Sequence, residues 1–221
     1  MSRWWAAISF MDMPERKGAV CAIPLFLGFA IWLAPAAAEA HTALQGVGSF
    51  WSGVAHLLTS LDQLGFLLGL AIWTSFQERR LDARVIGTAF VAALIGVWIG
   101  VSFGEATLLH LAAAFAGLMM AVGLAGATRL RVGAAPLLGL ALVGGVVGSA
   151  ASADATAGLS VALFALGGSI ATASVLSYGL LAARRLDTDW GRIARRAGAS
   201  WIAAIGLMVL ALSFAAHPGH V

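Results

Sequence analysis

Ionisable side chains are rare in this chain outside its arginine-rich segments, and most of the others lie in or beside long apolar runs. An Asp or Lys at the centre of a bilayer costs about 2.5 to 3.5 kcal/mol on insertion scales, so each such residue is a candidate for function. Imidazole and carboxylate groups together suit borderline divalent cations such as nickel, zinc, cobalt or copper. The candidate metal ligands are His41, His56, Asp62, Glu105 and Asp154.

The segment around His56 carries the densest group of polar residues. On a continuous helix, Ser60 lies about 40° from His56 and Gln63 about 20° from it on the other side, so the three form one polar stripe. Asp62 lies about 120° away on a different flank. The helix is therefore predicted to present polar groups to two neighbours or to a cavity between them. A structural hydrogen bond or a helix-helix clasp is the alternative role for His56 and Asp62.

The other candidates also have structural alternatives. Glu105 and Asp154 fall at the ends of predicted spans, where a carboxylate is often simply hydrated or caps a helix N-terminus. His110 follows Glu105 as a further polar pathway residue, with a packed, hydrogen-bonded histidine as the alternative. His41 would chelate a metal ion with its imidazole and a freed α-amino group if the chain were cleaved before it.

The composition indicates a membrane protein. Hydrophobic residues make up 61% of the chain and charged residues 10%, against roughly 25% charged residues in an average soluble domain. Apolar runs of about 20 residues recur, and that length crosses a hydrocarbon core of about 30 Å. The predicted fold is therefore an all-α membrane protein with a bundle of about six transmembrane helices. They are expected near residues 49–76, 84–103, 106–127, 133–151, 156–183 and 197–215.

Many glycines are spaced four residues apart, as in Gly65 and Gly69 or in Gly96, Gly100 and Gly104. Such spacing lets helix backbones approach closely in a bilayer. It predicts tight helix crossings at these positions, with a general richness of membrane helices in glycine as the alternative.

The first forty residues resemble a cleavable signal peptide. Two positive residues, Arg16 and Lys17, precede an apolar stretch, and Ala38-Glu39-Ala40 ends the segment. This is the order of an n-region, an h-region and an A-x-A cleavage site. Residues 1–40 are therefore predicted to be removed, leaving residues 41–221 as the transmembrane domain. An uncleaved signal anchor is the alternative, because the positive residues lie unusually far from the start of the chain.

The arginines predict the orientation in the membrane. All ten that follow the predicted cleavage site lie after the first, third or fifth span, and the other breaks contain no Lys or Arg. The positive-inside rule then places the arginine loops in the cytoplasm and both mature termini in the periplasm of a bacterial inner membrane. A nucleic-acid partner is not expected, because the arginines are spread over three loops without an aromatic-rich basic patch. They are Arg79, Arg80, Arg84, Arg129, Arg131, Arg184, Arg185, Arg192, Arg195 and Arg196.

The run HTALQGVGSFWSGVAHLLTSLDQLGFLLGLAIW resembles the start of the HupE/UreJ family of hydrogenase and urease accessory membrane proteins. The first span of that family carries a motif of the form H-P-x-x-G-x-D-H-L. His56 and Asp62 match it, whereas Leu57 replaces the proline, Ser60 the glycine and Gln63 the second histidine.

Later segments also resemble the family but have lost histidines. Glu105 falls on the acidic position of the third span, and Asp154 fits the acidic position that follows the fourth-span pattern A-L-F-A-L-F-H-G-H-A-H-G-x-E. Other residues occupy the histidine positions of the fourth and fifth spans, namely Val147, Ser149, Ala151 and Leu176.

The resemblance implies a nickel permease or metal-delivery protein that serves a metalloenzyme such as hydrogenase or urease. Nickel or another divalent ion would be bound or transported rather than held as a firm cofactor, and fewer nitrogen donors should weaken nickel binding or favour another cation. The expected path runs from His41 past His56, Asp62 and Glu105. No ATP-binding motif G-x-x-x-x-G-K-[ST] occurs.

The competing hypothesis is a non-transporting membrane subunit or assembly factor that has lost the metal site. Its partners would be the lipid bilayer and a metalloenzyme maturation system or membrane complex. An enzyme is not expected, because no nucleophile-base pair or dinucleotide fingerprint is found. Cys21 is the only cysteine and lies in the predicted signal peptide, which excludes disulfides and thiolate metal sites from the mature chain.

Overall fold

The computed structural model describes residues 48–103 and 105–215. The chain divides into two units, Met1–Ala40 and His41–Val221, and every described element belongs to the second. The predicted signal peptide and His41 lie outside the described residues, so both stay predictions. The described part is helical and contains no strand. Its elements are α2 (Ser49–Thr59), α3 (Leu61–Ser75), η1 (Arg79–Leu81), α4 (Asp82–Val101), α5 (Glu105–Ala127), α6 (Ala134–Ala150), η2 (Ala153–Thr156), α7 (Val161–Arg185) and α8 (Asp189–Ala215).

The lengths of these helices support a multi-pass membrane fold. Within the described residues, four segments are long and apolar enough to cross a membrane, and the α2–α3 pair adds a fifth if it counts as one bent span. The sixth apolar helix, α6, has 17 residues, which lies at the short end of the range of about 17 to 25 residues. The all-α membrane fold predicted from the sequence is confirmed. The four long segments are Arg79–Val101, His110–Ala127, Val161–Arg185 and Asp189–Ala215.

The first predicted span is not one continuous helix, which corrects the sequence-based expectation for residues 49–76. The chain breaks at Ser60, and α2 and α3 meet at 71°. The Ser60 hydroxyl donates to the carbonyl of His56 at 2.7 Å, and the Thr59 hydroxyl donates to that of Ala55 at 2.9 Å. Hydroxyl groups that bond back to the preceding turn favour bending a helix. Ser60 itself is extended, with φ −81° and ψ 97°.

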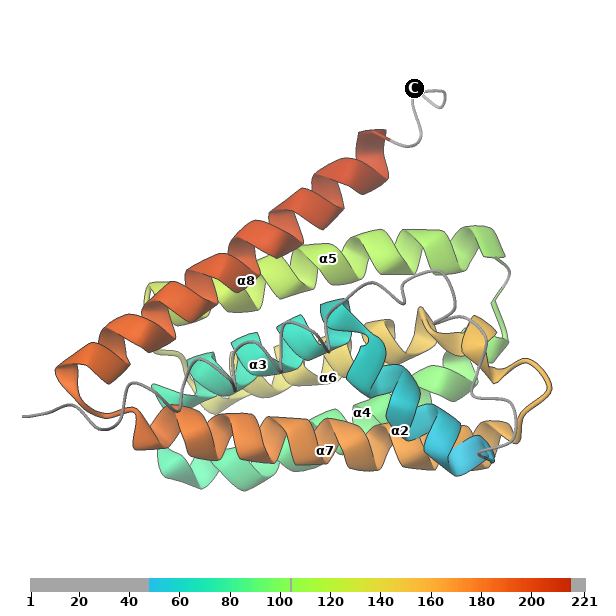
Figure 1. The fold of residues 1–221 in the computed structure, drawn as a ribbon, viewed down its shortest axis with the longest axis horizontal. Helices are drawn as coiled ribbons and strands as arrows, with labels where there is room; N and C mark the ends of the chain where they lie inside the picture. Colours follow the sequence, from blue (N-terminus) through green and yellow to red (C-terminus); the bar gives the residue numbers. More distant parts are fainter. Residues whose placement is uncertain (1–47, 104, 216–221) are drawn as a thin grey trace, which may run out of the picture. The chain divides into compact units, whose positions relative to one another are not determined.

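Helix α3 lies in the middle of the bundle. It contacts α5 and α7 most extensively and also touches α2, α4, α6 and α8. Around it the closest pairs are α5 with α8, α4 with α6, and α2 with α7 (Figure 1). Its side chains Phe66, Leu67 and Leu70 are buried in the main hydrophobic cluster.

The close crossings are made at glycines. A Cβ atom on Gly53 of α2 would overlap the carbonyl oxygen of Phe164 in α7, and one on Gly167 would overlap that of Phe50. The predicted close approach is also confirmed at Gly96, where a Cβ atom would come within 2.5 Å of the Val146 carbonyl oxygen in α6. Small residues allow such contact where burial from water supplies no driving force between helices.

The arginines lie in or beside three connections, α3–α4, α5–α6 and α7–α8, at one end of the bundle, on the left in Figure 1, which we call the arginine end. Arg184 at the end of α7 binds both carboxylate oxygens of Asp82 in the first turn of α4, at 2.8 and 2.5 Å. It also donates to the Ser75 carbonyl at the end of α3, at 3.1 Å. Arg196 of α8 donates to the Ala127 carbonyl at the end of α5, at 3.0 Å. The arginines predicted to share one side of the membrane are therefore grouped in space.

Candidate functional site

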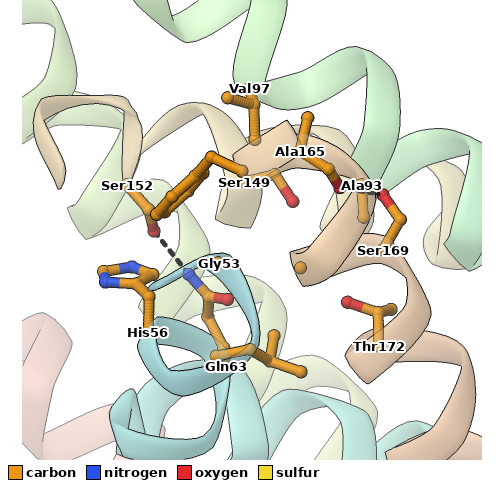
Figure 2. Close-up of a pocket in the computed structure, with 13 residues that line it drawn as sticks. Gly53, His56, Gln63, Ala93, Val97, Ser149, Ser152, Ala165, Ser169 and Thr172 are labelled. Carbon is orange, nitrogen blue, oxygen red and sulfur yellow. Dashed lines mark hydrogen bonds between the residues drawn. The ribbon is translucent and has the colours of Figure 1, made fainter. Parts of the chain in front are cut away.

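A small polar pocket lies beside the break between α2 and α3, in the half of the bundle opposite the arginine end. The space open to the centre of a water molecule is ≈ 20 Å³, which holds about one water molecule. Five helices, α2, α3, α4, α6 and α7, and Ser152, which follows α6, supply its walls. Its polar lining residues are His56, Gln63, Ser149, Ser152, Ser169 and Thr172, which surround the cavity in Figure 2.

Gln63 is the best-anchored polar side chain of the pocket. Its amide group donates to the Gly148 carbonyl at 3.2 Å and to the Ser152 hydroxyl, the contact drawn as a dashed line in Figure 2. Only 7% of Gln63 is exposed, so these bonds meet the requirement that buried polar groups be paired. The amide oxygen of Gln63 is left as an acceptor in the pocket.

His56 is the one imidazole among the described residues that line the pocket. Its ring lies 5.7 Å from the Phe164 ring, and its Nε2 atom lies 3.4 Å from the Ser60 hydroxyl. The residue is half-buried. Unlike Gln63, it can bind a metal ion through a ring nitrogen.

Hydroxyl side chains from α6, α7 and the residues after α6 complete the lining. Ser169 is fully buried and donates to the Ala165 carbonyl at 2.7 Å, and Ser152 donates to the Gly148 carbonyl at 3.0 Å. Each donated proton leaves the hydroxyl oxygen as an acceptor. Among the described residues that line it, the pocket therefore offers one imidazole and several neutral oxygen acceptors, and none of these residues carries a carboxylate.

The structure brings together only part of the predicted polar stripe. His56 and Gln63 share the pocket, while Ser60 lies at the break and contacts His56. The predicted stripe assumed one continuous helix, and this premise is wrong. Although the helix is broken between them, His56 and Gln63 line the same pocket. Asp62 is exposed in the first turn of α3 and does not line the pocket.

The other candidate residues lie elsewhere. Asp154 is exposed in η2, where its carboxylate accepts the Ala155 backbone N–H at 2.9 Å. His110 is exposed on α5. Glu105 begins α5, and its side chain lies outside the described residues, as His41 does. Among the residues that the structure describes, no group of three or more His, Cys, Asp or Glu side chains could hold a metal ion. The proposed metal ligands therefore stay predictions.

Sequence reasoning missed the contribution of Ser152, Ser169 and Thr172. The stretch that contains Ser169 and Thr172 is rich in small residues, and this pattern predicts only a helix face for close packing. The available signal was a pair of hydroxyl residues three apart in an apolar span, Ser169 with Thr172 on α7, repeated in Ser149 and Ser152. Such spacing places both side chains on one helix face.

The substituted motif positions separate into two groups. Gln63 and Ser149, which stand where the sequence motifs carry histidine, line the pocket together with His56. Val147 and Leu176 instead pack with the main hydrophobic cluster, and Leu176 is fully buried. The pocket is therefore lined by two of the positions at which the motifs carry histidine, and in this chain both positions hold neutral oxygen-bearing side chains.

A family model described as HupE / UreJ protein matches residues 29–210 of the chain. No curated protein and no solved structure matches it.

Proposed function

The chain belongs to the HupE/UreJ family, and on that premise we propose that it is an inner-membrane permease or metal-delivery protein for a divalent metal ion such as nickel. The family is associated with nickel or cobalt transport and with accessory roles for hydrogenase and urease. The proposed cargo would serve such a metalloenzyme. By the positive-inside rule, the arginine end faces the cytoplasm, so the pocket lies in the periplasmic half.

One observation carries the transport proposal: the polar pocket lies at the break in a discontinuous span. Residues from both sides of the break line it, with His56 on α2 and Gln63 on α3. Transporters commonly form ion sites where helices are interrupted, because the half-helix ends carry partial charges and free backbone groups. The C-terminal end of α2 carries partial negative charge, which favours a cation there.

The composition of the pocket favours transport of a divalent metal ion over tight binding of it. Neutral oxygen acceptors around one imidazole bind a nickel-like ion less tightly than a set of histidines does. A conducting site must bind its ion strongly enough to accept it and weakly enough to release it. The exposed Asp62, in the first turn of α3, would attract the cation towards the pocket without binding it inside.

The transport proposal is tested by metal accumulation in cells that express single variants at equal membrane abundance. His56→Ala should reduce nickel uptake towards the level of cells that lack the protein. Ser169→Ala should reduce it less, since only one of several oxygen acceptors is lost. Ser174→Ala is the matched control, because Ser174 lies on the same helix and bonds to its own helix at 2.8 Å outside the pocket. Unchanged uptake by His56→Ala would overturn the proposal.

A specific observation favours a second candidate, a non-transporting subunit or assembly factor. No group of three metal-binding side chains is found in the described part of the chain. If this role is correct, mild-detergent purification should return a stoichiometric partner and His56→Ala should leave metal uptake unaltered. Purification of the protein alone, together with uptake that depends on His56, would eliminate this candidate.

A further inference from the structure

A second, larger pocket opens at the arginine end of the bundle. It has a volume of ≈ 560 Å³ and is formed between the α3–α4 connection and the α5–α6 connection. This volume falls in the range of about 300 to 1,000 Å³ that is typical of small-ligand sites. The pocket is separate from the one at the α2–α3 break, and none of its lining residues takes part in the proposed metal path.

Positive charge dominates this pocket. Arg80, Arg84 and Arg131 line it, and Glu78 is the one acidic residue among the described side chains that line it. Glu78 pairs with Arg80. Arg84 and Arg131 are exposed and form no hydrogen bond or ion pair with any residue that the structure describes. Two guanidinium groups from different segments are therefore left to bind an anion.

The wall that carries Arg131 is held in place by Trp73 of α3 and by Gln77, which follows α3. The Trp73 indole N–H donates to the Leu130 carbonyl at 2.7 Å, and the Gln77 amide donates to the same oxygen at 2.8 Å. The Gln77 amide oxygen in turn accepts the Val132 backbone N–H at 3.2 Å. The backbone on both sides of Arg131 is thus fixed before any ligand binds, and preorganisation of this kind reduces the cost of binding.

The N-terminus of α6 adds to the attraction for anions. Gly133 and Ala134, at the start of that helix, line the same pocket. In the part of the chain that the structure describes, no side chain caps this end of α6. Uncapped N–H groups at a helix start favour negative charge. They are a secondary contribution here, since the arginines supply the full charges.

We propose that Arg84 and Arg131, with the N-terminus of α6, bind a phosphate group at the arginine end of the bundle. Guanidinium groups match phosphate oxygens with paired hydrogen bonds. The phosphate belongs either to an anionic phospholipid headgroup or to a soluble phosphate compound. Both ligands share the chemistry that the pocket recognises.

The test uses full-length protein purified in a neutral detergent. Native mass spectrometry after addition of phosphatidylglycerol or phosphatidylcholine reads out lipid binding, and calorimetric titration with inorganic phosphate against chloride reads out the soluble anion. The pocket variant is the double substitution Arg84→Gln and Arg131→Gln. The matched control is Arg79→Gln with Arg185→Gln, which removes the same charge from exposed residues at the same end outside the pocket.

Retention of phosphatidylglycerol but not phosphatidylcholine, lost in the pocket variant and kept in the control, supports the site with a lipid headgroup as its ligand. Binding of inorganic phosphate with the same dependence supports a soluble phosphate ligand. In either case the affinity should fall at least about tenfold in the pocket variant, which corresponds to about 1.4 kcal/mol. Equal loss of binding in the pocket variant and the control would overturn the proposal. So would an unaltered protein that prefers neither phosphatidylglycerol over phosphatidylcholine nor inorganic phosphate over chloride.

Discussion

Gln63 on α3 donates a hydrogen bond to Ser152, 89 residues later in the chain, just beyond the end of α6. The same amide reaches the Gly148 carbonyl at 3.2 Å. The two bonds join the central helix to the end of α6 at the floor of the pocket.

The first prediction concerns the stability that this contact provides. Ser152→Ala removes one of the two acceptors of the Gln63 amide and should lower the free energy of unfolding by about 0.6 kcal/mol, the average for polar contacts between membrane helices, and by no more than about 1.7 kcal/mol, their maximum. Thermal unfolding in detergent measures the change. Ser102→Ala is the control, since Ser102 is exposed and bonds only within its own helix. A loss of stability as large in the control would show that the contact with Gln63 is not the cause.

Gln63→His should strengthen metal binding. The new imidazole would enter the pocket beside His56, and a second nitrogen donor favours nickel. We expect the affinity for nickel to rise by about tenfold, or about 1.4 kcal/mol, as measured by calorimetric titration of the purified protein. Gln77→His places the same side chain at the other end of the bundle and should leave the affinity unaltered. An equal affinity in all three proteins would contradict a metal path through the pocket.

The crossing of α2 and α7 should not tolerate a larger residue. Gly53→Ala places a methyl group on the Phe164 carbonyl, so the helices must separate. Overpacking of this kind costs about 1 to 3 kcal/mol. Gly87→Ala in α4 is the control, because a Cβ atom there meets nothing within 4 Å, and it should stabilise the helix by about 0.5 to 1 kcal/mol. Thermal unfolding of both variants measures the difference. Similar midpoint temperatures for Gly53→Ala and Gly87→Ala would refute a close contact between α2 and α7 at Gly53.

The pair formed by Arg184 and Asp82 should be coupled more strongly than a surface pair. Its side chains are 14% and 25% exposed, against 76% and 65% for Arg80 and Glu78. A double-mutant cycle with Arg184→Gln and Asp82→Asn should give a coupling energy of about 1 to 2 kcal/mol. The same cycle on the exposed pair should give less than about 1 kcal/mol. Coupling energies of equal size would mean that burial does not strengthen the first pair.

Arg129, two residues after the end of α5, has a left-handed conformation with φ 55°. The Leu130 backbone N–H bonds back to the Ala125 carbonyl at 2.9 Å, a helix ending that usually employs glycine. Arg129→Gly should raise the free energy of unfolding by about 1 kcal/mol, because the left-handed conformation is costly for residues with a Cβ atom. Arg131→Gly, in the same connection but without a positive φ, should lower it. Chemical unfolding in mixed micelles measures the free energy of unfolding of both variants. A change of the same sign in both would show that the left-handed conformation of Arg129 is not the cause.

Composition and local pattern were sufficient to predict the membrane fold and the grouping of the arginines. Apolar runs and loop charges are properties of short segments, so they can be read without knowing which helices touch. The same holds for the glycines of α4, whose spacing correctly predicted the close contact with α6 at Gly96. The signal peptide and the role of Glu105 fall on residues or side chains outside the described part and stay predictions.

Only the tertiary structure decided which polar groups face one another. The bend at Ser60 ends the helical register on which the predicted stripe was based, so His56 and Gln63 meet across a break while Asp62 is left exposed. Ser152 and Ser169 become pocket residues because α6 and α7 bring them against the start of α3. The sequence alone could not supply this arrangement, because the rotation of each helix about its axis depends on the side chains of its neighbours.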